Sequence, residues 1–161
     1  MTIDTAMMRV SSINLDAVRM RAMHTYKWDV NKAAEVELTY RRFLALVACV
    51  PASQSAGLAP PSNDVDLMWH EHILHTYEYA AACDLIHGRF IHHVPKADSD
   101  KPEEGSLAAT VNLFLRYFGE APKLDADVRC NLNCDPRCKA KCNSQCHTCN
   151  TGCRSGHASP P

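Results

Sequence analysis

Apolar side chains recur at intervals of three and four residues between Lys32 and Val50, and this spacing predicts a long amphipathic helix. Pro51 ends the pattern, because proline cannot continue a helix. An apolar stripe of this length has to be buried, so other parts of the chain must pack against it. The stripe consists of Ala33, Val36, Tyr40, Phe43, Leu44 and Val47.

Four further segments show helical spacing, at 15–26, 65–74, 76–86 and 107–118. We therefore expect an all-α fold, a compact bundle of about five helices followed by an irregular or disordered Cys-rich tail. The expected division is a flexible N-terminus over 1–12, a helical domain over 13–122, a linker over 123–129 and the tail over 130–161.

The charge balance excludes some classes of partner. Net charge is -1 for the whole chain, so there is no overall basic character of the kind that nucleic-acid binding requires. No run approaches the roughly 18 apolar residues of a membrane helix, and the N-terminus lacks the pattern of a signal peptide. We expect no nucleic-acid or membrane partner and a cytoplasmic location, where thiols stay reduced.

The stretch 62–93 holds six of the nine histidines. On a helix, Asp66 and His70 share a face, whereas His72 points nearly the opposite way from His70. In the extended segment that follows, at most one of His92 and His93 serves a buried site. We name Asp66, His70, His72 and His92 as a candidate second metal site. The alternative is a carboxylate–imidazole bond that ties the helix into the core. His75 and His87 are expected at the surface or as caps.

Seven of the nine cysteines fall in the tail, five of them at intervals of four. Thiolates bind soft ions, so this spacing predicts a metal–thiolate segment for Cu(I) or Zn. The spacing differs from that of a standard zinc finger. The predicted tail ligands are Cys130, Cys134, Cys138, Cys142, Cys146, His147, Cys149 and Cys153.

These features favour a non-enzymatic metal-binding module for storage, buffering or delivery of a soft metal. Its partners would be the metal ion and a metal-acceptor protein. An alternative is a precursor whose tail is modified by a maturation enzyme that recognises the helical domain. A third is a metal-dependent enzyme that uses Asp66, His70 and His72. The chain has no Gly-rich phosphate loop, no nucleophile elbow and no HExxH, so we assign no catalytic or cofactor-binding residue.

The pattern Asp66-x-x-Trp69-His70-x-His72, continued by Leu74, Tyr79, Cys83, Gly88-Arg89 and His92, resembles the glycine-rich domain-containing protein-like family. The resemblance extends to the stretches 40–44 and 117–120, and so covers roughly residues 12–122. It implies a mostly helical domain without an established reaction. The glycine-rich region that gives the family its name is absent, as the chain has six glycines.

Overall fold

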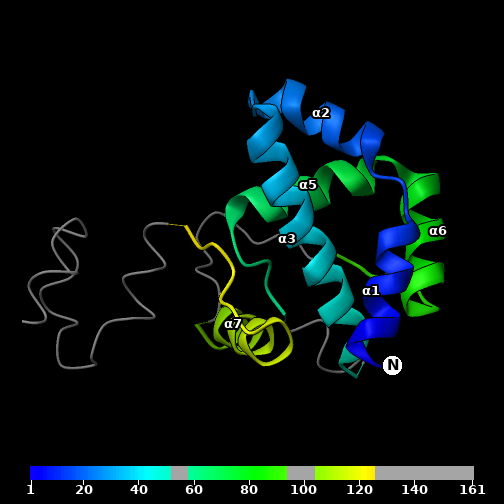
Figure 1. Cartoon of the computed structure of the whole chain (residues 1–161). Coiled ribbons are helices and arrows are strands. Elements are labelled where there is room, and N and C mark those ends of the chain that lie inside the picture. The colour runs from blue at the N-terminus through cyan, green and yellow to red at the C-terminus, as the bar shows by residue number, and fades with distance from the viewer. Residues whose placement is uncertain (52–57, 94–103, 126–161) are drawn as a thin grey trace, which may run out of the picture. The chain divides into compact units, whose positions relative to one another are not determined.

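A computed structural model describes residues 1–51, 58–93 and 104–125, with side chains from residue 107 in the last range. Within these ranges the chain forms six helices and no strand, which confirms the all-α prediction (Figure 1). Contacts divide the chain into a unit over 1–123 and a unit over 124–161. No described helix is long and apolar enough to cross a membrane. The helices are α1 (Ile3–Ser12), α2 (Asp16–Tyr26), α3 (Val30–Cys49), α5 (Asn63–Leu74), α6 (Thr76–His87) and α7 (Glu104–Phe118).

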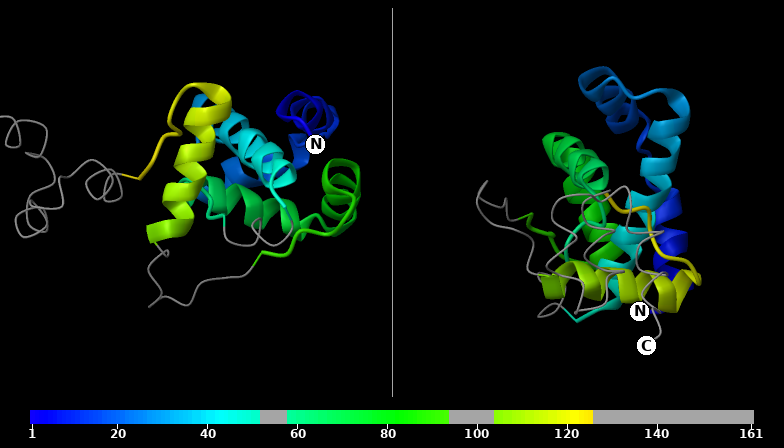
Figure 2. Two further views of the ribbon diagram at one scale, coloured as in Figure 1. Left: turned by 90° about the horizontal axis from the view of Figure 1, so that it is seen from below. Right: turned by 90° about the vertical axis from the view of Figure 1, so that its left-hand side faces the viewer.

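Helix α3 is the central element of the first unit, and it contacts each of the other five helices described (Figure 2). Asp29 caps its N-terminus by accepting a hydrogen bond from the Lys32 amide at 2.8 Å. All six side chains of the predicted apolar stripe are buried. The helix begins two residues earlier than predicted, at Val30, because the cap is Asp29.

The prediction of a flexible segment over 1–12 is wrong, because these residues include helix α1. Thr2 caps the helix through its hydroxyl, which accepts from the Thr5 amide at 3.3 Å. Ala6 and Val10 are fully buried, and α1 packs against α3 and α6. Tertiary packing therefore stabilises a helix that is too short to be stable alone.

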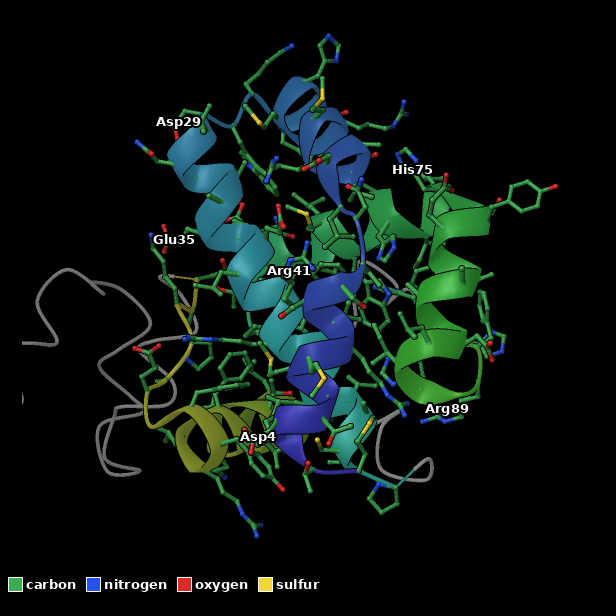
Figure 3. All side chains as sticks on the ribbon, turned by 45° about the vertical axis from the view of Figure 1, so that its right-hand side comes forward. Asp4, Asp29, Glu35, Arg41, His75 and Arg89 are labelled. Atoms are coloured by element: carbon green, nitrogen blue, oxygen red, sulfur yellow. The ribbon has the colours of Figure 1, made fainter. Side chains whose placement is uncertain are left out.

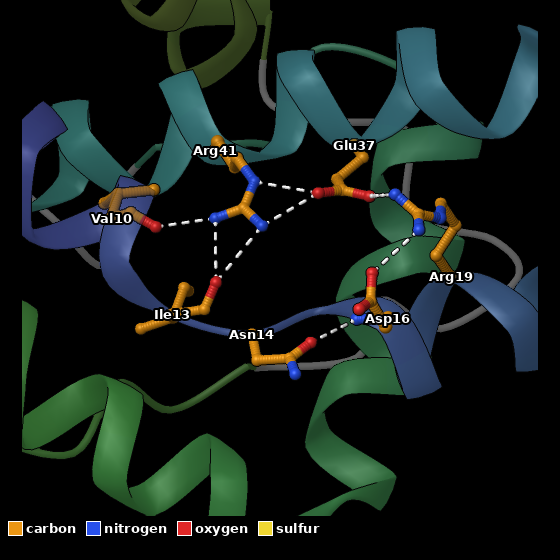
Figure 4. A network of polar contacts seen from close by, with 7 residues as sticks. All are labelled: Val10, Ile13, Asn14, Asp16, Arg19, Glu37 and Arg41. Carbon is orange, nitrogen blue, oxygen red and sulfur yellow. Dashed lines mark hydrogen bonds and ion pairs between the residues drawn. The ribbon is translucent and has the colours of Figure 1, made fainter.

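Arg41 of α3 fixes the end of α1 (Figure 4). Its guanidinium donates to the carbonyl of Val10 at 2.6 Å and to that of Ile13 at 3.2 Å. These are carbonyls at a helix C-terminus, which lack partners inside the helix. Glu37 accepts from Arg41 at 2.9 Å and from Arg19 of α2 at 3.0 Å. This network joins α1, α2 and α3.

Two short connections shape the region that follows. His75 alone separates α5 from α6, as Figure 3 shows near its label. Gly88 ends α6 in the left-handed conformation at φ 65°, which favours glycine. Residues 90–93 then run without helix or strand, and Ile91 is buried. Helix α7 packs against α3 through the fully buried Phe114.

Candidate metal site

Helix α5 presents Asp66 and His70 on one face. The Ser62 hydroxyl caps the helix by accepting from the Val65 amide at 3.3 Å, which places Asp66 in the first turn. Nδ1 of His70 lies 2.8 Å from the backbone oxygen of Asp66 and 3.5 Å from Oδ2 of its carboxylate. A carbonyl oxygen can only accept, so Nδ1 carries the proton. A neutral His70 then keeps a lone pair on Nε2.

His93 approaches the same carboxylate from the extended segment 90–93. Its Nε2 lies 2.8 Å from Oδ1 of Asp66, and its side chain is only 10% exposed. The ring lies 4.4 Å, between centroids, from the rings of both Trp69 and His70. A carboxylate accepts hydrogen bonds, so Nε2 is the donor here. Nδ1 of His93 is buried and has no hydrogen-bond partner among the described residues.

Asp66, His70 and His93 together form a group with the composition of a metal site. One donor atom from each residue lies within 4.8 Å of the others. Two imidazoles and one carboxylate suit borderline divalent ions such as Zn²⁺, for which bonds are about 2.0–2.2 Å long. The pair of atoms 2.8 Å apart on Asp66 and His93 is close enough to share one such ion. His70 is 43% exposed, and its ring lies 4.4 Å from that of His93 between centroids.

The structure does not bring His72 or His92 into this group, so the predicted set is corrected by replacing both with His93. His72 is 1% exposed on the inner face of α5, and its Nδ1 is 2.8 Å from the hydroxyl of Tyr40. Burial lowers the pKa of His72 to about 4, which keeps the ring neutral. His92 is exposed, and its ring lies 4.9 Å from that of Phe90 between centroids in a tilted arrangement.

His75 and His87 were predicted as surface or capping residues. Both are half-buried, and His75 is the cap at the end of α5 and at the start of α6. His75 lies at the junction of α5 and α6, and its amide donates to the carbonyl of His72 at 3.1 Å. Both ring nitrogens of His87 are buried without a hydrogen-bond partner in the described part of the chain. Burial lowers the pKa of His87 to about 4.

Glu71 is a buried charge that the sequence analysis did not single out. It is 3% exposed, and its carboxylate accepts from Arg21 at 2.8 Å and from the Tyr26 hydroxyl at 3.0 Å. These contacts join α5 to α2. Spacing gave no signal for Glu71, because both partners come from a segment more than 40 residues earlier in the chain.

Cys83 is buried in α6 and belongs to the hydrophobic core. Burial raises the pKa of its thiol, which disfavours the thiolate that nucleophilic chemistry requires. Cys49, at the end of α3, is half-buried, and burial raises the pKa of its thiol too. The predicted tail ligands, from Cys130 to Cys153, lie outside the described residues.

The helical domain with its histidine–carboxylate group falls in a family whose model matches residues 8–115. The match covers more than half of the chain, and the protein belongs to the UCP032817-like family. No curated protein and no solved structure matches it.

The expected resemblance to glycine-rich domain-containing proteins is therefore wrong, because the matching family model is a different one. Several residues that carried the resemblance serve general roles in packing and capping. Trp69, Tyr79 and Cys83 are core residues, and Gly88 caps α6. Many helical domains need such residues at similar spacings, so they do not distinguish one family from another.

Proposed function

We propose that this protein is a non-enzymatic metal-binding protein whose helical domain holds one borderline divalent ion, such as Zn²⁺, between Asp66, His70 and His93. The observation that supports this most directly is the convergence of three potential ligands from two segments of the chain. Asp66 and His70 come from α5, and His93 comes from a segment 27 residues away from Asp66 in sequence.

The proton position at His70 also favours metal binding. A histidine that binds a metal usually donates its other ring N–H to a carbonyl or a carboxylate. His70 makes that bond from Nδ1 to the carbonyl of Asp66, which leaves Nε2 for the ion. At His93 the ion would bind Nε2, so the proton of the neutral ring would move from Nε2 to Nδ1. The partial exposure of Asp66 and His70 leaves room for water on the outer side of the ion.

We further propose that the Cys-rich tail stores, buffers or delivers a soft metal, Cu(I) or Zn, to an acceptor protein. The supporting observation is the repeat of cysteines from Cys130 to Cys153. Thiolates select softer ions than an imidazole–carboxylate site does. Zn²⁺ would suit both sites, whereas Cu(I) would suit the tail alone. The tail function needs reduced thiols, as in the cytoplasm.

Elemental analysis of the anaerobically purified full-length chain tests both proposals. A matched variant replaces the seven tail cysteines with serine. We expect the wild type to carry several equivalents of metal and the serine variant to retain about one. Adding His93→Gln to the serine variant should remove that last ion, whereas adding His92→Gln, one residue away and exposed, should not.

The other outcomes have definite meanings. A serine variant without metal at saturating Zn²⁺ contradicts the helical-domain site and leaves Asp66, His70 and His93 as a structural hydrogen-bonded group. An unmetallated wild-type chain contradicts the tail proposal. If the tail from the native host also shows mass shifts at its cysteines or hydroxyl residues, the precursor alternative replaces the proposal of metal storage by the tail.

A further inference from the structure

We infer that Tyr79 is a positioning residue of the proposed metal site and acts by holding His93 in place. This inference rests on the proposed function of the site. Tyr79 lies on α6, and its hydroxyl donates to the backbone oxygen of Ile91 at 2.6 Å. Ile91 precedes His93 by two residues in an extended segment, so its anchoring fixes where the His93 ring can reach.

The Tyr79 hydroxyl is itself fixed from a second side. Nε1 of Trp69 donates to it at 2.9 Å, so the oxygen accepts one hydrogen bond and donates another. Tyr79 is 1% exposed, so water does not compete for these bonds. The ring of Trp69 also lies against His93 at 4.4 Å between centroids. Trp69 therefore contacts both Tyr79, which holds Ile91, and the proposed metal ligand His93.

Burial reinforces the same attachment. Ile91 is 5% exposed and belongs to the same hydrophobic core as Tyr79 and Cys83 of α6. Helix α6 thus holds Ile91 through the Tyr79 hydroxyl and through packing. Asp66 and His70 need no such support, because they lie on the regular helix α5. His93 is the ligand whose position depends on a contact made by another element.

This arrangement predicts a defined defect in a Tyr79→Phe variant. The ring and its packing remain, but the Ile91 oxygen and Trp69 Nε1 lose their partner. The segment 90–93 then becomes freer, and His93 is held less well against Asp66. Loss of groups that orient metal ligands typically weakens metal binding by about 10–100-fold. We expect a weakening of about tenfold.

Titration with Co²⁺, followed by visible absorption, and competition with Zn²⁺ test the inference. The protein used is the full-length chain with serine at the seven tail cysteines, so that thiolates do not bind the probe. Tyr77→Phe is the matched control on the same helix, as Tyr77 is 88% exposed. Tyr40→Phe removes a buried hydroxyl that contacts His72 and not the metal group. Both controls should bind Co²⁺ within about twofold of the parent protein.

A double-mutant comparison separates positioning from general damage to the fold. If Tyr79 acts through His93, Tyr79→Phe should add nothing to the weakening caused by His93→Gln. Additive losses would overturn the inference, and so would a Tyr79→Phe variant that binds Co²⁺ as tightly as its parent. If the parent protein binds neither ion, the proposed function fails, which is a separate result.

Circular dichroism establishes whether each variant is folded at the temperature of the titration. Should Tyr79→Phe not fold, Trp69→Phe tests the same chain of contacts from its other end, since it removes the Nε1–H donor to the Tyr79 hydroxyl. The same criteria apply. Weaker Co²⁺ binding that is non-additive with His93→Gln supports the inference, and unchanged or additive binding overturns it.

Discussion

The two faces of α5 place histidines only two residues apart in opposite environments. His70 is on the outer face, 43% exposed, beside Asp66 and His93. His72 is on the inner face, 1% exposed, hydrogen-bonded to Tyr40 and packed edge-on against the ring of Tyr79. A run such as WHEH is therefore not one chemical unit on a helix, because a rotation of about 200° separates the two rings.

The largest expected difference between the two faces is in stability. His72→Ala should lower the free energy of unfolding by about 3 kcal/mol, because it creates a cavity and leaves the buried Tyr40 hydroxyl without a partner. Urea denaturation of the metal-free protein measures this. The exposed His92→Ala is the control, with a change within about 0.5 kcal/mol. A loss below about 1 kcal/mol for His72→Ala would show that the buried ring and its bond to Tyr40 contribute little to the free energy of unfolding.

The outer face should show the reverse behaviour. In the variant with serine in the tail, Zn²⁺ at 100 times its Kd should raise the free energy of unfolding by about 2.7 kcal/mol. His70→Ala should remove this increase and leave the metal-free stability almost unchanged. The exposed His24→Ala on α2 should keep the full increase. A His70→Ala variant still stabilised by Zn²⁺ would contradict the assignment of His70 to the site.

A third histidine, His87 of α6, should make the stability of the fold depend on pH. Burial lowers the pKa of His87 to about 4, below the ordinary value of 6.5, so the fold favours the neutral ring. As pH falls from about 6.5 toward 4, the unfolded chain binds the proton first, and stability is lost. The effect should fade above about pH 7, where the ring is mostly neutral in the unfolded chain as well.

We expect His87→Gln to reduce the stability lost between pH 7 and pH 5 by about 1 kcal/mol, a value discounted for the partial exposure of the ring. Urea denaturation at pH 7, 6 and 5 with a chelator present measures the difference. His24→Gln, an exposed histidine, should leave the pH dependence unchanged. An unchanged pH dependence in His87→Gln would mean that the ring gains a proton as easily in the folded chain as in the unfolded one.

Most of the helical architecture could be predicted, because burial of one face leaves a period of three to four residues in the sequence. The inner position of His72 was predictable in the same way. Val65, Met68 and His72 follow helical spacing and are all buried, so the histidine occupies a place in an apolar stripe. Helix α1 was missed because only two of its ten residues are buried, which leaves too short a pattern to detect.

The choice between His92 and His93 could not be made from the sequence. Alternation in an extended segment says that one side chain faces inward, but not which one. Which of the two side chains faces inward is set by Tyr79, whose hydroxyl donates to the backbone oxygen of Ile91 twelve residues later. Such a contact between segments leaves no periodic trace in either of them. Of the three proposed metal ligands, Asp66 and His70 could therefore be named from the sequence, and His93 could not.

The contact between His93 and Asp66 also has a topological consequence. It closes a loop of 27 residues that contains the whole of α6. Helix α6 cannot separate from α5 at both of its ends unless this contact and the Tyr79–Ile91 bond open as well. Native-state hydrogen exchange should therefore report α6 and residues 90–93 as one cooperative unit, and closure of the loop by the ion should slow its exchange.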